Sequence, residues 1–241
     1  MWLSLIIPAY NEEKRIKETL EAYRSKLLEL GINFEIIVEM DGCTDRTPEI
    51  VRELAVKFPE IKFIEFKERL GKGGGLLKGF EIASGDVVGF VDADGSVKPS
   101  EFIKLLSEIE RDYDIVIASR RAEGAVVRNQ PLLRKVLSKG FNVLVKLLFR
   151  LPFKDTQCGA KVFRRNALEK ILPEVNSKGF AFDVNLLYLA TRNGFRIKEV
   201  GIRWEDKRGS KVKGRTVVEM FLAVIKLRLR YSLLRFLLGG G

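Results

Sequence analysis

The feature that most constrains this chain is an uncharged apolar run at residues 87–91, which ends at two acidic residues, Asp92 and Asp94. A short run of Val, Gly and Phe is typical of a strand buried on both faces, as in parallel sheets covered by helices. Ligands of such open sheets bind beyond the carboxyl ends of the strands, so both carboxylates would face a substrate. Two oxygen ligands suit Mg²⁺ or Mn²⁺ bridging to phosphates, although Asp-x-Asp is a common pattern that also fits a solvated turn.

This run belongs to a regular alternation of strand and helix patterns. Apolar strand patterns at residues 3–7, 34–40, 61–66 and 87–91 are each followed by a helical pattern, and a further strand is expected at 115–118. The alternation predicts an α/β fold with a doubly wound, mostly parallel sheet flanked by helices. Pro8 ends the first strand, and Asn11 is expected to cap the first helix. Lys72 stands among glycines that open the third helix, where backbone N–H groups would approach a phosphate or form a flexible turn.

The second half of the chain contains helices with marked charge patterns. A loop is expected at 123–131, a helix after residue 180, an edge strand at 197–204 and a last helix at 216–238. In the helix expected at 132–151, basic and polar side chains share one arc and apolar side chains fill the other. This amphipathic pattern suits the surface of an anionic membrane, and it equally fits a helix packed on the sheet. The charges of the last helix share no face, so membrane contact, core packing and self-association into a homo-oligomer remain open for it.

Composition and charge narrow the chemistry. The 241-residue chain contains no histidine, which excludes Ser-His-Asp catalysis and most zinc sites. Cys43 and Cys158 form no CxxC pattern, which fits a reducing compartment. Residues 1–119 carry a net charge of −7 and residues 120–241 one of +18. We therefore expect the second half to face an anion, such as a nucleic acid, a membrane surface or a phosphorylated substrate.

The patterns predict one domain over residues 1–211, with a nucleotide-binding half at 1–119 and an acceptor half at 120–211, and a C-terminal amphipathic helix at 212–241. Met1 leads directly into the first strand, which predicts no signal peptide. No apolar stretch reaches the roughly 20 residues that a membrane-spanning helix needs. We expect a cytoplasmic protein that is peripheral on the cytoplasmic face of a membrane.

Taken together, the motifs resemble those of a known enzyme family. Five motifs in order are similar to the inverting family-2 glycosyltransferases of GT-A fold: Pro8-Ala9-Tyr10-Asn11-Glu12, Asp41-Gly42, Gly71-Lys72-Gly73, Asp92-Ala93-Asp94 and Ser119-Arg120. Three further motifs resemble the dolichyl-phosphate glucose synthases, with the dolichol-phosphate mannose synthases as close relatives: Asp155-Thr156-Gln157-Cys158-Gly159, Phe182-Asp183-Val184 and Gly209-Ser210-Lys211. The resemblance covers nearly the whole chain.

This resemblance implies several groups of site residues. The nucleotide sugar would be bound by Pro8, Ala9, Tyr10, Glu12, Asp41, Lys72, Asp92, Ala93 and Asp94. A Mg²⁺ or Mn²⁺ ion on the donor diphosphate would be held by Asp92 and Asp94. Phosphates of the donor or acceptor would face Arg120, Arg134, Ser138, Ser210 and Lys211. The implied catalytic residues are Asp94, Arg120 and Asp155. Two positions depart from the family pattern: Met40, where many relatives carry Asp, and Glu205, where mannose synthases tend to carry Arg.

The implied function is transfer of a hexose, with glucose favoured, from UDP-glucose to dolichyl or another polyprenyl phosphate with inversion. The attacking phosphate oxygen is already ionised, because the second pKa of a phosphate monoester is about 6, so little general-base help is needed. Asp155 or Asp183 would orient the acceptor or serve a structural role. Alternatives are mannose transfer from GDP-mannose, transfer to a different lipid or a soluble sugar, and a nucleic-acid surface on the basic half. The last is disfavoured because no aromatic stripe alternates with Lys or Arg.

Overall fold

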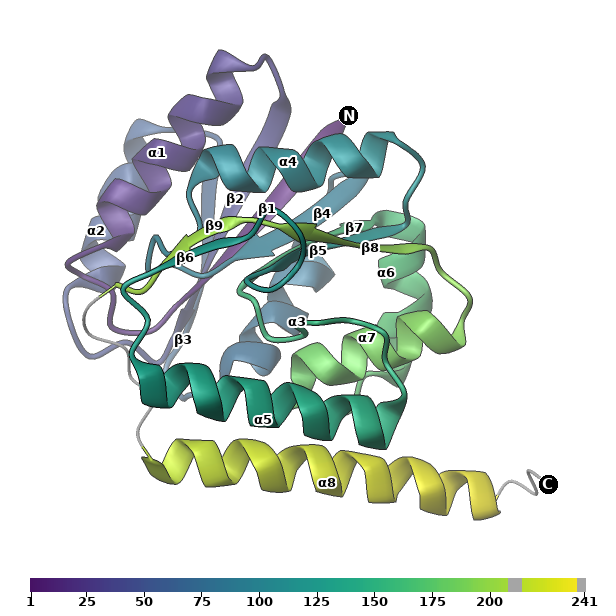
Figure 1. The fold of residues 1–241 in the computed structure, drawn as a ribbon. Coiled ribbons are helices and arrows are strands. Elements are labelled where there is room, and N and C mark those ends of the chain that lie inside the picture. The colour runs from purple at the N-terminus through teal and green to yellow at the C-terminus, as the bar shows by residue number, and fades with distance from the viewer. Residues whose placement is uncertain (208–213, 238–241) are drawn as a thin grey trace.

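The computed structural model describes residues 1–207 and 214–237, and its centre is a seven-stranded sheet (Figure 1). The strands lie in the order β3-β2-β1-β4-β7-β5-β8. Their bounds are β1 Trp2–Ala9, β2 Asn33–Asp41, β3 Ile61–Phe66, β4 Val87–Val91, β5 Ile115–Ser119, β7 Ala160–Arg164 and β8 Ile197–Gly201. Ser210 and Lys211, which were predicted to bind phosphate, lie outside the described residues.

The sheet is mostly parallel, as predicted. β1 pairs in parallel with β2 and with β4, β2 pairs in parallel with β3, and β5 with β8. Within this sheet β7 runs antiparallel to both of its neighbours, β4 and β5, and so joins the two parallel groups. The carboxyl ends of β1, β2, β4 and β5 therefore point to one edge of the sheet, which we call the carboxyl edge.

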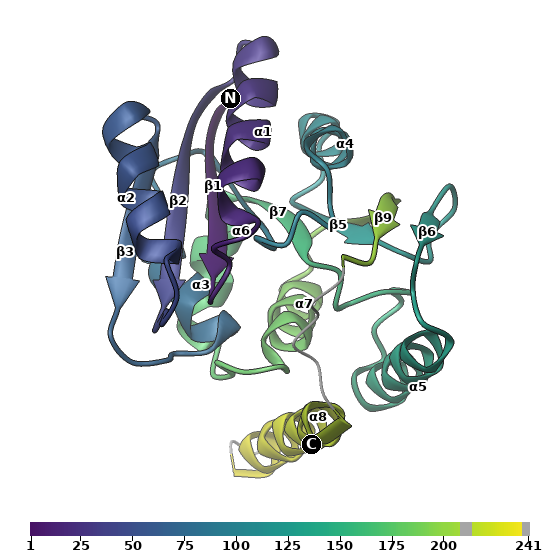
Figure 2. The same cartoon turned by 90° about the vertical axis from the view of Figure 1, so that its left-hand side faces the viewer.

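Helices cover both faces of the sheet (Figures 1 and 2). Their bounds are α1 Ile16–Glu29, α2 Thr47–Lys57, α3 Lys72–Ile82, α4 Pro99–Glu110, α5 Leu132–Phe149, α6 Arg165–Ile171, α7 Phe182–Arg192 and α8 Gly214–Leu237, with a short 3₁₀ turn, η1, at Leu172–Glu174. Apolar residues of α1, α2 and α4 form the core on one face, and those of α3, α5, α6, α7 and α8 form the core on the other.

Two local predictions from the sequence were wrong. α1 begins later than expected, because Asn11 adopts a left-handed conformation with a φ of 53° and its side-chain amide exchanges hydrogen bonds with Thr44 at 3.0 and 2.8 Å. The loop expected at 123–131 contains a strand, β6 Val126–Arg128, that pairs in parallel with β9 Arg203–Glu205. All three β6 residues are exposed, so no pattern of burial marks the strand in the sequence.

The side of α5 that faces the protein combines apolar and polar residues. Its buried residues are Phe141, Asn142, Val145 and Phe149. The opposite side of the helix exposes the apolar side chains of Leu132, Leu133, Val136, Val143 and Leu147. Lys135, Lys139 and Lys146 are exposed and follow the helical period on the arc beside them.

α8 repeats this arrangement and lies beside α5 (Figure 1). Its buried side carries Val224, Leu227 and Tyr231, and its opposite side exposes Val218, Leu222, Ile225, Leu229 and Leu233. Phe141 and Phe221 pack edge to face between the two helices, with ring centroids 5.6 Å apart. We call the exposed apolar residues of both helices, with the lysines of α5, the α5–α8 platform. No helix within residues 1–207 or 214–237 has the apolar length that crossing a bilayer requires.

The contact between α3 and β1 can be tested at Gly79, where a methyl group would lie 2.7 Å from Cγ2 of Ile6. We expect Gly79→Ala to lower the free energy of unfolding by about 1–3 kcal/mol, because the fully buried Ile6 would have to move. Gly140→Ala in α5 is the matched control: its position has open space, so the better helix former should stabilise by about 1 kcal/mol. Urea unfolding measures both changes, and a Gly79→Ala protein as stable as the original would contradict this packing.

Candidate active site

The carboxyl end of β4 is held in place by other segments. Asp92 donates its backbone N–H to the carbonyl of Gly159 at 2.9 Å, and a side chain at Gly159 would come within 1.8 Å of Asp92 Oδ2. The carbonyl of Ala93 accepts a hydrogen bond from the Thr19 hydroxyl at 3.0 Å. Asp94 Oδ1 accepts a backbone N–H two residues further on at 2.9 Å. The predicted acid pair is therefore part of a fixed turn at the carboxyl edge.

Lys72, in the first turn of α3, reaches the same turn. Its Nζ lies 2.6 Å from Oδ1 of Asp92. Burial acts to lower the pKa of Lys72, but the charges of Asp92 and then Asp183 outweigh burial and raise the pKa. Burial raises the pKa of Asp92 against the opposing effect of Lys72. The structure thus brings together a cation and the predicted metal carboxylates.

The ends of β1 and β2 form the neighbouring part of the carboxyl edge. The two carboxylate oxygens of Asp41 accept the backbone N–H groups of Leu70 at 2.5 Å and Gly71 at 3.0 Å. Asp41 therefore holds the loop that leads into α3. The guanidinium of Arg69, which the sequence analysis did not identify, lies 3.6 Å from the ring centroid of Tyr10. Tyr10 and Asp41, both predicted to bind the nucleotide, are thus linked to one loop.

The other predicted nucleotide residues lie in or just after β1. Pro8 and Ala9 are the last two residues of the strand, and Ala9 is buried. Glu12 donates its backbone N–H to the Thr47 hydroxyl at 2.7 Å, and its carboxylate accepts a hydrogen bond from Arg15 at 2.7 Å. These contacts attach the loop after β1 to the start of α2, so the loop has a defined shape.

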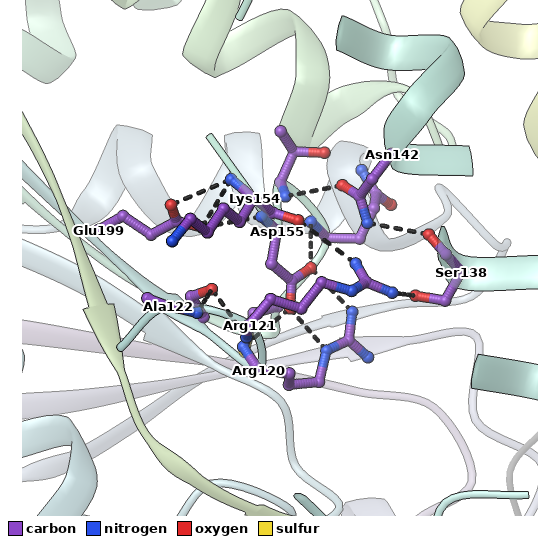
Figure 3. Close-up of polar contacts among 12 residues, drawn as sticks. Arg120, Arg121, Ala122, Ser138, Asn142, Lys154, Asp155 and Glu199 are labelled. Atoms are coloured by element: carbon purple, nitrogen blue, oxygen red, sulfur yellow. Dashed lines mark hydrogen bonds and ion pairs between the residues drawn. The ribbon is translucent and has the colours of Figure 1, made fainter. Parts of the chain in front are cut away.

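Arg120 and Asp155 form a buried pair at the end of β5 (Figure 3). Nε and Nη2 of Arg120 donate to the two carboxylate oxygens of Asp155 at 2.7 and 2.9 Å, and the backbone N–H of Arg120 donates at 3.0 Å. Burial acts to raise the pKa of Asp155, but Arg120 outweighs it and lowers the pKa. Two of the three predicted catalytic residues are therefore brought together, with Asp155 holding the guanidinium.

The next arginine connects this pair to α5. Arg121 donates to the hydroxyl of Ser138 at 2.8 Å (Figure 3). One turn further along α5, Asn142 accepts the backbone N–H of Thr156 at 3.3 Å. Ser138, predicted to contact phosphate, therefore attaches α5 to the segment after β5, and Asn142 attaches the helix to the loop before β7.

Trp204 of β9 lies between the two described arginines that were predicted to bind phosphate. The guanidinium carbons of Arg120 and Arg134 lie 5.3 and 5.8 Å from its ring centroid. Arg134 also pairs with Asp206. Trp204 is buried, and no pattern along the chain separates it from an ordinary core aromatic residue. The two arginines therefore belong to one cluster between β5, β9 and α5.

Lys161, the second residue of β7, was not among the site residues expected from the sequence. Its side chain is 0% exposed and donates to Asp183 Oδ1 at 2.6 Å and to the carbonyl of Cys158 at 2.9 Å. A charged residue within an apolar strand signals a buried partner, but nothing along the chain says which one. Burial raises the pKa of the Cys158 thiol to about 12, so this cysteine stays protonated and is not a nucleophile.

Glu39 of β2 is a further buried acid, and it lies under the glycines that open α3. It is 0% exposed, and neither carboxylate oxygen has a hydrogen-bond partner among the described residues. A side chain at Gly75 would come within 2.0 Å of Glu39 Oε2. Burial, followed by the charge of Asp41, raises the pKa of Glu39 to about 8. Glu39 is therefore largely protonated at neutral pH.

The acid pair suits a metal ion that shares its ligands with a diphosphate. Within the described part of the chain, no group of three His, Cys, Asp or Glu side chains is placed to hold a metal ion. Mg²⁺ commonly binds through one or two carboxylates together with phosphate oxygens and waters. Asp92 and Asp94 provide such a pair, so these residues fit a divalent ion that arrives with a nucleotide diphosphate.

Comparison with known sequences then assigns the family. Residues 4–172 match the sequence model of glycosyl transferase family 2. The chain belongs to glycosyl transferase family 2. It is 34% identical to a dolichyl-phosphate beta-glucosyltransferase of Dictyostelium discoideum, over 97% of this chain and 76% of that protein. It is 35% identical to the Saccharomyces cerevisiae enzyme of the same name, over 88% of this chain and 69% of that protein. The predicted resemblance to these enzymes is confirmed.

Solved structures of low sequence identity share the fold of this glycosyltransferase. The mannosyl-3-phosphoglycerate synthase of Rubrobacter xylanophilus aligns with a TM-score of 0.72 at 15% identity, covering 95% of this chain and 73% of that one. The glucosyl-3-phosphoglycerate synthase of Mycobacterium tuberculosis, solved with Mn²⁺, UDP and phosphoglyceric acid, aligns with a TM-score of 0.69 at 20% identity, covering 94% and 78%. The predicted GT-A fold is confirmed.

Glu39 should make the stability of this glycosyltransferase depend on pH. Its pKa is about 8 in the folded protein against an ordinary value of 4.5. Between these values unfolding releases a proton, so stability falls as pH rises, by up to about 1.4 kcal/mol per pH unit. We expect Glu39→Gln to remove this slope, so the variant gains stability relative to the original protein from pH 5 to pH 8. Urea unfolding at both pH values tests this, with exposed Glu53→Gln as the control, and an unchanged slope would contradict it.

Proposed function

We propose that this glycosyltransferase transfers a hexose, with glucose favoured, from a nucleotide diphosphate sugar, with UDP-glucose favoured, to dolichyl or another polyprenyl phosphate with inversion. The proposal rests on one observation: Asp92 and Asp94 share the carboxyl edge with Lys72, in a chain similar over nearly its whole length to dolichyl-phosphate beta-glucosyltransferases. An acid pair beside a cation is suited to a diphosphate bound with a divalent ion.

The donor would bind along the carboxyl edge. Tyr10 and Asp41 lie where the base and ribose would be held, and Lys72 would neutralise charge on the diphosphate. A Mg²⁺ or Mn²⁺ ion bound by Asp92 and Asp94 would stabilise the negative charge of the leaving group. Mn²⁺ and UDP are present together in the M. tuberculosis enzyme that shares this fold.

The acceptor phosphate would attack from the basic half of the chain. One of its oxygens forms a bond to the anomeric carbon as the bond from that carbon to the diphosphate oxygen breaks, and the nucleotide diphosphate leaves with the electron pair. No proton has to be removed from a phosphate that is already ionised. Arg120, oriented by Asp155, would face the acceptor phosphate. The protein's contribution is therefore positioning and charge neutralisation.

Transfer can be tested with purified protein, Mn²⁺ or Mg²⁺, a short polyprenyl phosphate and a panel of UDP- and GDP-sugars. We expect the lipid phosphate to be glycosylated, with UDP-glucose as the best donor. Asp94→Ala should lower the rate about a hundredfold or more, because the diphosphate loses the charge compensation that depends on this carboxylate. Asp86→Ala, an exposed acid at the other end of β4, is the matched control and should keep full activity. A fully active Asp94→Ala enzyme would refute the site.

The same panel distinguishes the rival substrates. A preference for GDP-mannose would favour the mannose alternative, which is supported by 34% identity to the polyprenol monophosphomannose synthase of Mycolicibacterium smegmatis, over 94% of this chain and 86% of that protein. Transfer to 3-phosphoglycerate or a free sugar, with no transfer to the lipid phosphate, would indicate that the acceptor is a soluble molecule and not a lipid.

A lipid acceptor also requires contact with a membrane, and we propose that the α5–α8 platform makes it. Among the residues whose side chains the structure describes, the two helices expose ten large apolar side chains opposite their buried sides. From residue 124 to 154 the chain contains no acidic residue, whereas α5 carries Lys135, Lys139 and Lys146. Apolar side chains flanked by lysines suit the headgroup zone of an anionic bilayer. Ser138 attaches the same helix to Arg121, and Asn142 attaches it to the loop that contains Asp155, so the platform is linked to the site.

Vesicle flotation tests this contact. We expect the protein to float with vesicles that contain anionic lipid, less so at high salt, because part of the attraction is electrostatic. The double variant Val136→Gln/Leu147→Gln should lose most of this binding, since both side chains are exposed on the platform. Leu28→Gln, an exposed leucine of α1, is the matched control. Flotation of the double variant at the original level would exclude the platform as the contact.

A further inference from the structure

Lys161 is buried at a position where an apolar residue would be the ordinary choice. On β7 it pairs with Phe90 of β4 and Ile117 of β5, in the middle of the sheet. Burying an ammonium group costs several kcal/mol before pairing, and buried ion pairs often stabilise a fold no better than apolar residues of similar size. Stability alone therefore does not explain the pair that Lys161 forms with Asp183.

Both partners of the Lys161 ammonium belong to walls of the donor site. Its bond to the carbonyl of Cys158 fixes the residue before Gly159, and Gly159 leaves space for the carboxylate of Asp92. Its bond to Asp183 holds the first turn of α7. That turn packs on the start of α3, where a side chain at Gly73 would come within 2.7 Å of Phe182. Lys161 thus connects to both segments that surround the Lys72–Asp92 pair.

The two lysines of these ion pairs lie near one aromatic ring. The ammonium groups of Lys72 and Lys161 lie 5.4 and 5.3 Å from the ring centroid of Phe90. Lys72 pairs with Asp92, Lys161 pairs with Asp183, and the charge of Asp183 also acts on Lys72. The four charges sum to zero. Loss of any one would change the electrostatic field at Asp92, because the protein interior screens charges poorly.

We propose that Lys161 is a positioning residue of the donor site: its ion pair with Asp183 sets the charge balance around Lys72 and Asp92, and so the affinity for both the metal ion and the nucleotide diphosphate. This inference rests on the proposed donor site but not on the identity of the acceptor. A nearby positive charge lowers the affinity for a cation and raises the affinity for an anion. A purely structural role of Lys161 would not shift the two affinities in opposite directions.

The test measures binding rather than turnover. Mn²⁺ affinity is followed by electron paramagnetic resonance, and UDP affinity without metal by calorimetry. In Lys161→Met we expect Mn²⁺ to bind roughly threefold or more tightly and UDP to bind more weakly by a similar factor, because one positive charge is lost. Asp183→Asn should shift both affinities the opposite way. The double variant Lys161→Met/Asp183→Asn, which is neutral again, should return both to within about twofold of the original.

The controls separate a charge effect from damage to the fold. Lys78→Met removes a lysine of α3 whose charge is paired with Glu81 at the surface, and it should change neither affinity. If Lys161→Met does not fold, Asp183→Asn and the double variant carry the same test. Shifts in the same direction, no shifts, or a double variant that fails to recover would overturn the inference. An original protein that binds neither Mn²⁺ nor UDP would overturn the proposed donor site itself.

Discussion

The carboxyl edge of the sheet depends on charge neutralisation between distant segments. The parallel strands β2 and β4 deliver Asp41 and Asp92 to this edge, the loop before the antiparallel β7 brings Asp155 beside it, and α7 adds Asp183. Each of these carboxylates is paired with a cation from another segment: Arg69, Lys72, Arg120 and Lys161, respectively. Without these pairs the burial of so many acids would oppose folding. The same pairs place cations where a doubly charged donor and acceptor would meet, so the requirement of the fold and that of the chemistry coincide.

Within this arrangement Glu39 is an exception, and the exception has a physical reason. It lies on the same strand as Asp41 and equally deep, yet its carboxylate has no hydrogen-bond partner among the described residues, and the glycines of α3 close over it. A carboxyl in such a place avoids the cost of burial by keeping its proton. Asp41 resolves the same difficulty differently, since two backbone N–H groups and Arg69 stabilise its charge.

Features with a local signal were predictable from the sequence, and features that depend on contact between distant segments were not. The uncharged run before Asp92 indicates a buried strand, and its end places the acids, so β4 and the acid pair needed no further information. The partner of Lys161 could not be read in this way, because Asp183 lies on a helix that meets β7 only in the folded sheet. The short β6 was missed because backbone pairing with β9 forms it while its side chains stay exposed.

The orientation of α5 shows the same limit in a different form. Its sequence defines a polar arc and an apolar arc, but it does not say which one meets the protein. The side that meets the protein draws on both arcs: apolar residues such as Phe141 join the core, while Asn142 and Ser138 bond to the segments of Asp155 and Arg121. Leu147 and its neighbours stay outside. Core packing and specific hydrogen bonds therefore decide the rotation of this helix together.

The position of β7 affects the order in which the sheet can be completed during synthesis. β4 and β5 follow each other in the chain, but they do not pair with each other in the sheet. β7, which is synthesised later, lies between them. β1 to β4 can assemble as soon as they leave the ribosome, whereas β5 has to wait for β7 before it gains a neighbour on that side. α5 is synthesised during this interval. Its exposed leucines are therefore accessible to other molecules before β7 has completed the sheet.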